Sequence, residues 1–354
     1  MARENLSIRL AERPTDNIIP GKTFKQVREP APTADDLKDN EILVEALYLS
    51  LDPAMRGWLN DTRSYVPPVA IGEIMRGATV SRVLASKNAS VKVGDLVTAT
   101  TGWQEVAIVA PPNFDVVTVP AGTSPADAIG VLGWTGLTAY FGLSKIGHPG
   151  PGDTVVVSGA AGATGSVAGQ IAKLRGAKRV VGIAGSEDKC RWLTAELGFD
   201  AAVNYKSATF AKDLAAATPD YVNVYWDNVG GPVLEAVLAR AAPRARFVMC
   251  GSISGYNNPG KGAPGAGIRN LAIVTAQRVR MEGFIVFDYA GEYAAAREEI
   301  ARWLAEGKLK HKKTIVPGGL QAADSAILKL FDGSNYGKLL VEVKPLEAGG
   351  ASRL

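Results

Sequence analysis

Small residues between an apolar run and a helical pattern form the stretch best suited to chemistry. The β-branched run Thr154–Ser158 has the length of one buried parallel strand. Ala160, Gly162 and Gly165 then occupy the places of a G-x-G-x-x-G fingerprint, and apolar residues recur at helical spacing as far as Gly176. Such a turn lets the backbone approach a pyrophosphate, whose charge the helix N-terminus attracts. The pattern predicts a dinucleotide site, although Ala160 makes the fingerprint degenerate and an ordinary βα turn is the alternative.

The end of the next predicted strand, at Ala184, bears on which dinucleotide fits. Proteins selective for NAD usually carry Asp or Glu there, on the ribose 2′-hydroxyl. Here Gly185 follows, and Lys189 comes in the first turn of the next helix. A lysine in this place would attract a 2′-phosphate, which favours NADPH. A solvated lysine is the alternative, and the adjacent Glu187 and Asp188 weaken the case for NADPH.

The sequence contains few cysteine and histidine residues that could bind a metal ion. A catalytic zinc needs about three Cys, His or carboxylate ligands, and a structural zinc usually has four. The chain has two cysteines, Cys190 and Cys250, and two histidines, His148 and His311, which are far apart in the sequence. We therefore expect no metal site.

Strands and helices alternate from Gly152 onward, which predicts an α/β domain with a doubly wound parallel sheet and ligands at the carboxyl ends of its strands. The expected strands are Thr154–Ser158, Arg179–Ala184, Ala202–Tyr205, Tyr221–Asp227, Ala245–Cys250 and Met281–Val286. The expected helices are 166–175, 187–197, 210–217, 232–241, 269–279 and 292–305.

The first 130 residues instead show short alternating runs and many turns, which predict a compact β domain that is partly barrel-like. Its expected strands are Glu41–Leu49, Gly77–Leu84, Leu96–Thr100 and Glu105–Val109. The long segment between the first two carries Trp58 and Tyr65 and is interpreted as a binding loop, with a plain surface excursion as the alternative. We expect a strand at 313–316, a helix at 322–331 and a strand at 338–343 to return to this domain.

Composition excludes several classes of protein. The 354 residues carry a net charge of +4, which is too small and too dispersed to indicate nucleic acid or a membrane surface as partner. No apolar run approaches the ~18 residues needed to span a bilayer. The N-terminus lacks the apolar core of a signal peptide. Together with the low cysteine count, these features predict a cytoplasmic protein.

Nine segments in a fixed order make the chain resemble a known family. They are LSLDPAMRGWL (49–59), GWTGLTAYFGL (133–143), AAGATGSVAGQIAKLRG (160–176), GIAGSEDKCRWL (182–193), LGFDAAVNYK (197–206), WDNVGG (226–231), CGSISGYN (250–257), RMEGFIV (280–286) and GSNYGKLLVEV (333–343). The chain resembles the zinc-independent branch of the medium-chain dehydrogenase/reductases, and within it the NADPH-dependent alkene reductases that include leukotriene B4 12-hydroxydehydrogenase, prostaglandin reductase and curcumin reductase. The resemblance implies a GroES-like substrate domain (1–130, completed by 312–354) and a Rossmann NADPH-binding domain (131–311). Relatives are often homodimers, so a homodimer is expected.

The resemblance also implies roles for individual residues. The pyrophosphate would lie on Ala161, Gly162, Ala163 and Thr164, and the 2′-phosphate on Gly185, Lys189 and Tyr205. The ribose or nicotinamide would meet Asn228, and the nicotinamide side would meet Cys250, Gly251, Ser252, Ile253, Ser254 and Tyr256. Main-chain groups of Phe284, Ile285 and Val286 would meet the carboxamide, and Asn335 would close over the cofactor. Several of these have plain alternatives, in which Tyr205 and Phe284 fill core and Asn228 stabilises a turn.

The implied reaction is reduction of the C=C bond of an α,β-unsaturated aldehyde or ketone by hydride from NADPH, without zinc. Tyr256, together with the 2′-hydroxyl of the nicotinamide ribose, is the expected donor to the developing enolate oxygen, and packing of this ring on the cofactor is the alternative. Many relatives have tyrosine where this chain has Ala54, so either the pocket is wider or Trp58 or Tyr65 compensates. A quinone reductase of the same superfamily is the second hypothesis, and a non-catalytic NADPH-binding protein is the third.

Overall fold

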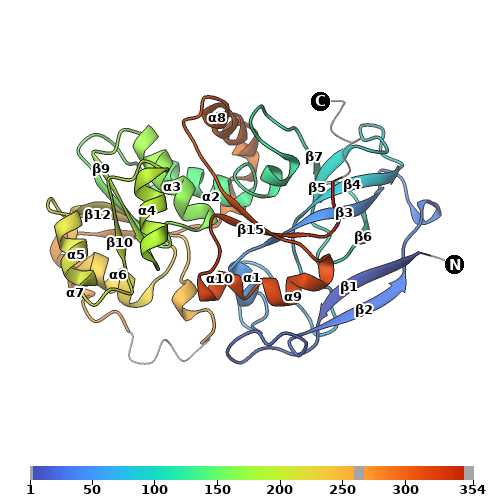
Figure 1. Ribbon diagram of the computed structural model, residues 1–354, viewed down its shortest axis with the longest axis horizontal. Coiled ribbons are helices and arrows are strands. Elements are labelled where there is room, and N and C mark those ends of the chain that lie inside the picture. Colours follow the sequence, from blue (N-terminus) through green and yellow to red (C-terminus); the bar gives the residue numbers. More distant parts are fainter. Residues whose placement is uncertain (1–2, 259–266, 347–354) are drawn as a thin grey trace. The chain divides into compact units, whose positions relative to one another are not determined.

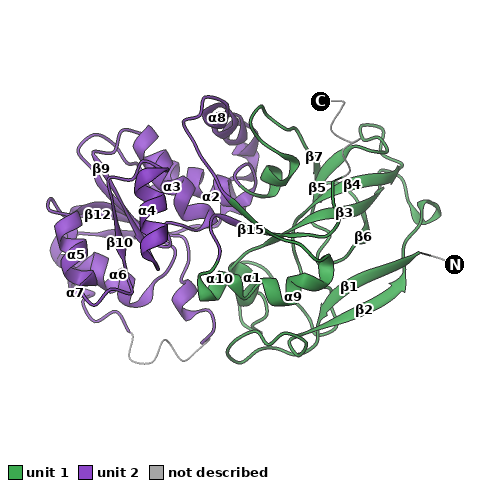
Figure 2. Ribbon diagram, viewed as in Figure 1, with its two compact units in different colours: residues 1–130, 313–334, 339–354 green, residues 131–312, 335–338 purple. Residues whose placement is uncertain are grey.

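Two sheets form the frameworks of the computed structural model, which describes residues 3–258 and 267–346. Figure 1 shows the elements along the chain, and Figure 2 shows the two units into which they divide. Unit 1 consists of Met1–Gly130, Lys313–Ser334 and Leu339–Leu354. Unit 2 consists of Val131–Lys312 and Asn335–Lys338, so that four residues of the C-terminal segment go with the second unit.

Unit 2 contains a six-stranded parallel sheet in the order β10-β9-β8-β11-β12-β13. Its strands are β8 (Thr154–Val157), β9 (Arg179–Ala184), β10 (Ala201–Asn204), β11 (Val222–Asp227), β12 (Ala241–Met249) and β13 (Arg280–Gly283). The helices are α2 (Trp134–Phe141), α3 (Ala163–Leu174), α4 (Glu187–Ala195), α5 (Phe210–Ala217), α6 (Gly231–Leu238), α7 (Ala272–Gln277) and α8 (Tyr293–Ala305). The doubly wound α/β architecture expected from the sequence is confirmed.

Hydrophobic cores cover both faces of this sheet. Val155 and Val157 of β8 belong to the core that includes side chains of α2, α3 and α8. Val156, between them, belongs to the core that includes side chains of α5 and α6. Because successive side chains of a strand point to opposite faces, a strand buried on both faces is apolar throughout, as β8 is.

Several predicted boundaries in unit 2 are wrong. The helix predicted at 232–241 ends at Leu238, and β12 begins at Ala241 rather than Ala245. The register between β11 and β12 shifts near Val222, and Arg244 has a φ of 62°, so an irregular segment lies inside the strand and interrupts its alternation. The strand predicted at 281–286 ends at Gly283, so the backbone of 284–286 lies outside the sheet ladder.

Unit 1 is built on a seven-stranded sheet in the order β14-β15-β3-β4-β5-β7, with β6 paired to β3. Its strands are β3 (Ile42–Leu51), β4 (Thr79–Ser86), β5 (Leu96–Ala99), β6 (Val106–Val109), β7 (Phe114–Val116), β14 (Lys313–Val316) and β15 (Lys338–Glu342). β15 runs antiparallel to β3, so a C-terminal strand completes a sheet of N-terminal strands. The helix predicted at 322–331 is instead two short helices, α9 (Ala323–Ala326) and α10 (Lys329–Asp332), because i→i−3 hydrogen bonds replace the α-helical pattern around Leu328.

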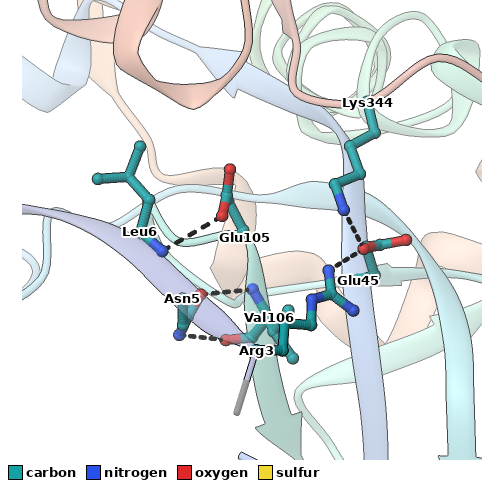
Figure 3. Close-up of polar contacts among 7 residues, drawn as sticks. All are labelled: Arg3, Asn5, Leu6, Glu45, Glu105, Val106 and Lys344. Carbon is teal, nitrogen blue, oxygen red and sulfur yellow. Dashed lines mark hydrogen bonds and ion pairs between the residues drawn. The ribbon is translucent and has the colours of Figure 1, made fainter. Parts of the chain in front are cut away.

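A separate pair of antiparallel strands, β1 (Glu4–Leu10) and β2 (Phe24–Pro30), precedes this sheet. Figure 3 shows how β1 is fastened: the Asn5 amide exchanges two hydrogen bonds of 2.9 Å with the backbone of Val106. Nearby, Arg3 and Lys344 both bind the Glu45 carboxylate. Burial alone would raise the pKa of Glu45, but these two cations outweigh it and hold the pKa below its ordinary value. Polar side chains therefore tie the first strand to the main sheet of unit 1.

Candidate functional site

The turn after β8 differs from the fingerprint read in the sequence. Gly159 has a φ of 57°, so the glycine that the turn requires lies one residue before Ala160. The Ala160 amide donates to the carbonyl of Ile183 (3.0 Å), which fixes the turn against β9. A Cβ atom on Gly165 would lie 2.4 Å from the carbonyl oxygen of Gly159. Although Ala160 replaces the first glycine of the fingerprint, Gly159 supplies the positive φ that the turn needs. Gly165 lets α3 pack closely against the turn.

The N-terminus of α3 presents the four residues predicted to hold the pyrophosphate. Gly162 is the N-cap residue, so no side chain caps the helix, and no acidic residue lies in its first turn. Ala161 is buried, whereas Gly162, Ala163 and Thr164 are partly exposed. The first N–H groups of a helix have no partner within the helix, and the helix dipole adds positive potential there. This end of α3 suits a pyrophosphate, a group that the residues present can hold.

A C-terminal segment lies directly against this turn. The Gly337 amide donates to the Ala161 carbonyl (2.9 Å), and Gly337 forms a parallel bridge with Gly162. The predicted Asn335 is buried, and its side-chain amide donates to the Gly337 carbonyl (3.2 Å). Asn335 is thus brought, from a distant part of the sequence, to the turn predicted to hold the pyrophosphate.

Two of the three residues predicted for the 2′-phosphate, Gly185 and Tyr205, lie against each other at the carboxyl end of β9. A Cβ atom on Gly185 would lie 3.0 Å from the Tyr205 ring, so the phenol lies across the glycine. Lys189 follows in the first turn of α4, where its amide donates to the N-cap residue Ser186 (3.3 Å). The Lys189 ammonium lies 5.2 Å from the ring centre of Tyr336, a residue that the sequence reasoning missed. The one sequence signal for Tyr336 is its neighbour Asn335, which the resemblance assigns to the cofactor.

Asn228 follows β11, and its side chain is engaged with the sheet edge. Its Nδ2 donates to the Ser158 carbonyl (2.6 Å), and its Oδ1 accepts from the indole of Trp226 (3.0 Å). These bonds match the turn-stabilising alternative considered for this residue. They also hold Asn228 beside Gly159, whose Cβ position lies 3.3 Å from the Asn228 Cβ. Asn228 therefore joins the ends of β8 and β11.

Asp227, which the sequence reasoning did not single out, organises this end of the sheet. It is fully buried. Its Oδ1 accepts four hydrogen bonds of 2.8–3.1 Å, from Tyr225, Ser158, and the amides of Val229 and Gly230. Among the described residues, its Oδ2 has no hydrogen-bond partner. Burial raises the pKa of the Tyr225 hydroxyl, and the Asp227 charge raises it further. The only hint in the sequence is an acidic residue at the end of an apolar strand.

The same aspartate anchors the predicted loop 250–256. The amides of Cys250 and Gly251 both donate to the Asp227 carbonyl (2.9 and 3.0 Å). Farther along, Ile253 and Ser254 donate backbone hydrogen bonds to Asn228 and Val229 (3.2 and 3.1 Å). The loop after β12 is thereby laid along the loop after β11.

The side chains of this loop differ in chemistry. Burial, and then the Asp227 charge, raise the pKa of the Cys250 thiol to about 12. The Tyr256 hydroxyl accepts a hydrogen bond from the Ser252 amide (3.2 Å). A Cβ atom on Gly251 would lie 2.9 Å from this hydroxyl. Cys250 is therefore a neutral thiol, and Tyr256 is held over Gly251.

The residues predicted to meet the carboxamide follow β13. The ring of Phe284 packs edge-on against Trp226, with 6.0 Å between ring centres. The carbonyl of Ile285 accepts from Asp288 (3.1 Å), and that of Val286 accepts from the Tyr293 hydroxyl (3.0 Å). Phe284 thus has the core-packing contact considered as its alternative role, and both carbonyls are engaged within the chain.

The two pocket candidates of unit 1 contact each other. The indole N–H of Trp58 donates to the Tyr65 hydroxyl (2.7 Å). Trp58 ends the short helix α1 (Ala54–Gly57), which the buried Arg56 fastens through hydrogen bonds to the carbonyls of Pro14 (3.1 Å) and Asp16 (2.7 Å). A phenol hydroxyl is thus fixed relative to α1, whose first residue is Ala54.

Neither a cluster of potential metal ligands nor a helix able to span a membrane is found in the part of the chain that the structure describes. Residues 3–258 and 267–346 contain no group of three or more His, Cys, Asp or Glu side chains placed to hold a metal ion. None of the helices in these residues combines the length and apolarity needed to cross a bilayer.

Known proteins share both the sequence and the fold. Residues 7–117 match the family model of the N-terminal domain of oxidoreductase, and residues 163–302 match that of the zinc-binding dehydrogenase. YfmJ of Bacillus subtilis, named as an NADP-dependent oxidoreductase, is 44% identical over 97% of this chain and 99% of its own. The NADPH-dependent curcumin reductase of Escherichia coli is 38% identical over 94% of this chain and 95% of its own. The NADP-dependent 2-alkenal reductase of Nicotiana tabacum is 38% identical over 86% and 88%.

Solved structures agree with these relatives. CurA of Vibrio vulnificus in complex with NADPH matches with a TM-score of 0.89 and 40% identity over 96% of this chain and 100% of CurA. A quinone oxidoreductase of Pseudomonas syringae, at 24% identity and a TM-score of 0.73, shares the fold over 96% of this chain and 100% of its own. The chain therefore belongs to the medium-chain dehydrogenase/reductase family, in the group of NADP-dependent oxidoreductases that includes the curcumin and prostaglandin reductases.

Proposed function

We propose that this protein reduces the C=C bond of α,β-unsaturated aldehydes or ketones with NADPH. The observation that carries the proposal is the set of elements joined at the carboxyl end of the parallel sheet. These elements are the uncapped N-terminus of α3, the first turn of α4 with Lys189, and the loops after β11 and β12, which are both hydrogen-bonded to Asp227. Together they support a dinucleotide site of the kind found in this family. The 2-alkenal reductase and curcumin reductase relatives support the substrate class.

The chain's own contribution to this reaction is binding, orientation and charge stabilisation. Bound NADPH supplies hydride to the β-carbon of the conjugated substrate. Negative charge then develops on the carbonyl oxygen, and a hydrogen-bond donor aimed at that oxygen lowers the barrier. We assign this role to the Tyr256 hydroxyl, which the Ser252 amide positions through the acceptor side of its oxygen. The α-carbon takes its proton from water or a tyrosine, which completes the addition of hydrogen across the double bond.

An assay with three substrate conditions tests the proposal. NADPH oxidation is followed with an enone, with a quinone and with neither. Faster turnover of the enone supports the proposal. Faster turnover of the quinone would favour the second hypothesis, and binding of NADPH without turnover would favour the non-catalytic one. A panel of short enals, long-chain enones and bulky phenolic enones then defines the size of substrate that the enzyme accepts.

We further propose that catalysis needs no metal ion, because cysteine and histidine are so scarce in the sequence. Activity is expected to survive EDTA and phenanthroline. Loss of activity on chelation that zinc restores would contradict this. The 2′-phosphate contacts assigned to Gly185, Lys189 and Tyr205 likewise predict tighter binding of NADPH than of NADH.

Trp58 and Tyr65 are proposed as substrate-pocket residues, with the Tyr65 hydroxyl standing in for the phenol absent at Ala54. The hydrogen bond that fixes Tyr65 to Trp58 supports this assignment. We also propose that the protein is cytoplasmic and that it forms a homodimer. Light scattering coupled to size-exclusion chromatography measures the oligomeric state directly.

A further inference from the structure

Two lysines from distant parts of the sequence lie close to the ring of Tyr336. The Lys189 ammonium lies 5.2 Å from the ring centre, and the Lys312 ammonium lies 4.9 Å from it. Lys312 is also 5.6 Å from the ring of Trp192, which meets Tyr336 edge-on. We call Lys189, Trp192, Lys312 and Tyr336 the lysine–aromatic cluster. All four belong to unit 2.

Backbone hydrogen bonds hold the cluster to the phosphate-binding turn. Lys189 and Trp192 are three residues apart on α4, so their side chains share one face of the helix. The residue after Tyr336, Gly337, donates to the carbonyl of Ala161 in the turn (2.9 Å). The Lys338 amide donates to the Lys312 carbonyl (2.9 Å), which joins the two remaining segments of the cluster.

This arrangement places two positive charges beside one ring. Like charges repel each other, and the faces of aromatic rings attract cations and offset part of that cost. The acidic residues at the start of α4 are engaged elsewhere, because Glu187 accepts from Asn204 (2.8 Å) and Asp188 pairs with Arg191. In the described residues, Lys312 has the two aromatic rings as its side-chain contacts and forms no ion pair. Lys312 therefore carries a positive charge that an anionic ligand would pair.

We propose that Lys312 and Tyr336 determine cofactor specificity by completing the 2′-phosphate site around Lys189. The 2′-phosphate lies at the carboxyl end of the second strand of such a sheet, which here is the end of β9 before Lys189. Lys312 supplies a second cation to this phosphate. Tyr336 is a positioning residue whose ring lies close to both ammonium groups. The inference rests on the proposed use of NADPH and extends it to residues outside the α4 turn.

Binding measurements with the full chain test the inference without relying on turnover. Dissociation constants are measured for NADPH, NADH and 2′,5′-ADP, a fragment that carries the 2′-phosphate without the nicotinamide. Lys312→Ala is expected to weaken NADPH and 2′,5′-ADP about tenfold, since each loses a charge-assisted contact, and to leave NADH unchanged. The affinity of this variant for NADPH should also depend less on salt concentration.

Further variants separate the two roles. Tyr336→Phe keeps the ring and should retain the preference for NADPH, whereas Tyr336→Leu should reduce it. Lys178→Ala is the charge-matched control, since Lys178 lies before β9 and pairs with Asp220 (2.8 Å). It should leave all three constants unchanged. Thermal unfolding of each variant verifies that it is folded.

The outcomes distinguish this inference from the proposed reaction. Equal losses of NADPH and NADH affinity in Lys312→Ala, or no loss of either, would overturn the role of Lys312. Equal preference for NADPH in Tyr336→Leu and Tyr336→Phe would overturn the positioning role. If the wild-type protein prefers NADPH but does not reduce enones, the proposed reaction fails and the specificity site stands.

Discussion

The backbone amide of Ser252 donates a hydrogen bond of 3.2 Å to the hydroxyl oxygen of Tyr256. The bond closes the turn formed by the short helix Ile253–Gly255 and holds the phenol over Gly251. Because the oxygen accepts here, the orientation of the hydroxyl is set by the backbone rather than by a substrate. A donor positioned in advance is what stabilisation of a developing oxyanion requires.

Replacing Tyr256 by phenylalanine tests this donor. If the hydroxyl stabilises the enolate, Tyr256→Phe should lower kcat, because the contact strengthens as charge develops. Loss of one such donor costs about 3 kcal/mol, or roughly a hundredfold in rate. Steady-state kinetics with a good enone measure the effect, and NADPH affinity should change little because the ring remains.

Tyr256→Ala is the companion variant. A wild-type kcat in Tyr256→Phe, together with weaker NADPH binding in Tyr256→Ala, would assign the ring to cofactor packing. That result would remove Tyr256 from the donors and leave the cofactor ribose hydroxyl and water.

Asp227→Asn should lower both stability and cofactor affinity. The substitution keeps the shape of the side chain but removes the charge that accepts four hydrogen bonds at Oδ1. Hydrogen bonds to a charged group contribute about 1.5–3 kcal/mol each, so a loss of about 2–3 kcal/mol in the free energy of unfolding is expected. NADPH affinity should fall as well, because the carboxylate anchors the loop after β11 through the Val229 and Gly230 amides, and the loop after β12 is hydrogen-bonded along that loop.

A second aspartate serves as the control for this change. Asp153, just before β8, accepts from Arg246 (2.7 Å) and is partly exposed. Asp153→Asn should cost less stability and leave NADPH affinity unchanged. Equal effects of the two variants on cofactor binding would show that Asp227 does not organise the site.

The two thiols should resist alkylation in the folded protein. Burial, with a smaller contribution from Glu187, raises the pKa of Cys190 to about 11, and the pKa of Cys250 is raised to about 12. At pH 8 the thiolate fractions are then about 10⁻³ and 10⁻⁴, and only the thiolate reacts. Mass spectrometry after iodoacetamide treatment should find both thiols intact in the native protein and both labelled after unfolding. Rapid labelling of native Cys250 would contradict its assignment as a neutral thiol.

The alternation of strands and helices in unit 2 could be predicted because it depends on local sequence patterns. A β-branched run such as Thr154–Val157 and the helical spacing that follows it depend on neighbours a few residues away. The pair β1–β2 was missed because β2 is largely exposed and lacks the alternation of a half-buried strand. Its pairing depends on β1, which precedes it by a long connection.

The residues missed in the site are those whose partners lie far along the chain. Asp227 owes its role to Ser158, which is 69 residues away. Tyr336 reaches Lys189 only because Gly337 binds the turn at Ala161. Gly159, the glycine that the turn requires, lies one residue before Ala160, where the G-x-G-x-x-G spacing places the first glycine. Local patterns contain none of these relationships.

The close approach of α3 to the turn after β8 makes a prediction about Gly165. An alanine Cβ at this position would lie 2.4 Å from the Gly159 carbonyl oxygen and 2.9 Å from the Ala160 Cα. Both are backbone atoms, so no side chain can move aside, and the N-terminus of α3 must shift instead. The amides that would meet the pyrophosphate move with it.

Gly165→Ala is therefore expected to lower the free energy of unfolding by about 1–3 kcal/mol, the usual cost of overpacking, and to weaken both NADPH and NADH. Equal weakening is expected because the pyrophosphate is common to the two cofactors. Gly150→Ala is the control, since a Cβ there meets nothing within 4 Å and its φ is not in the left-handed region. Thermal unfolding and titration of both cofactors measure the effects. If Gly165→Ala destabilised the protein but bound both cofactors as tightly as Gly150→Ala does, the N-terminus of α3 would not be the pyrophosphate site.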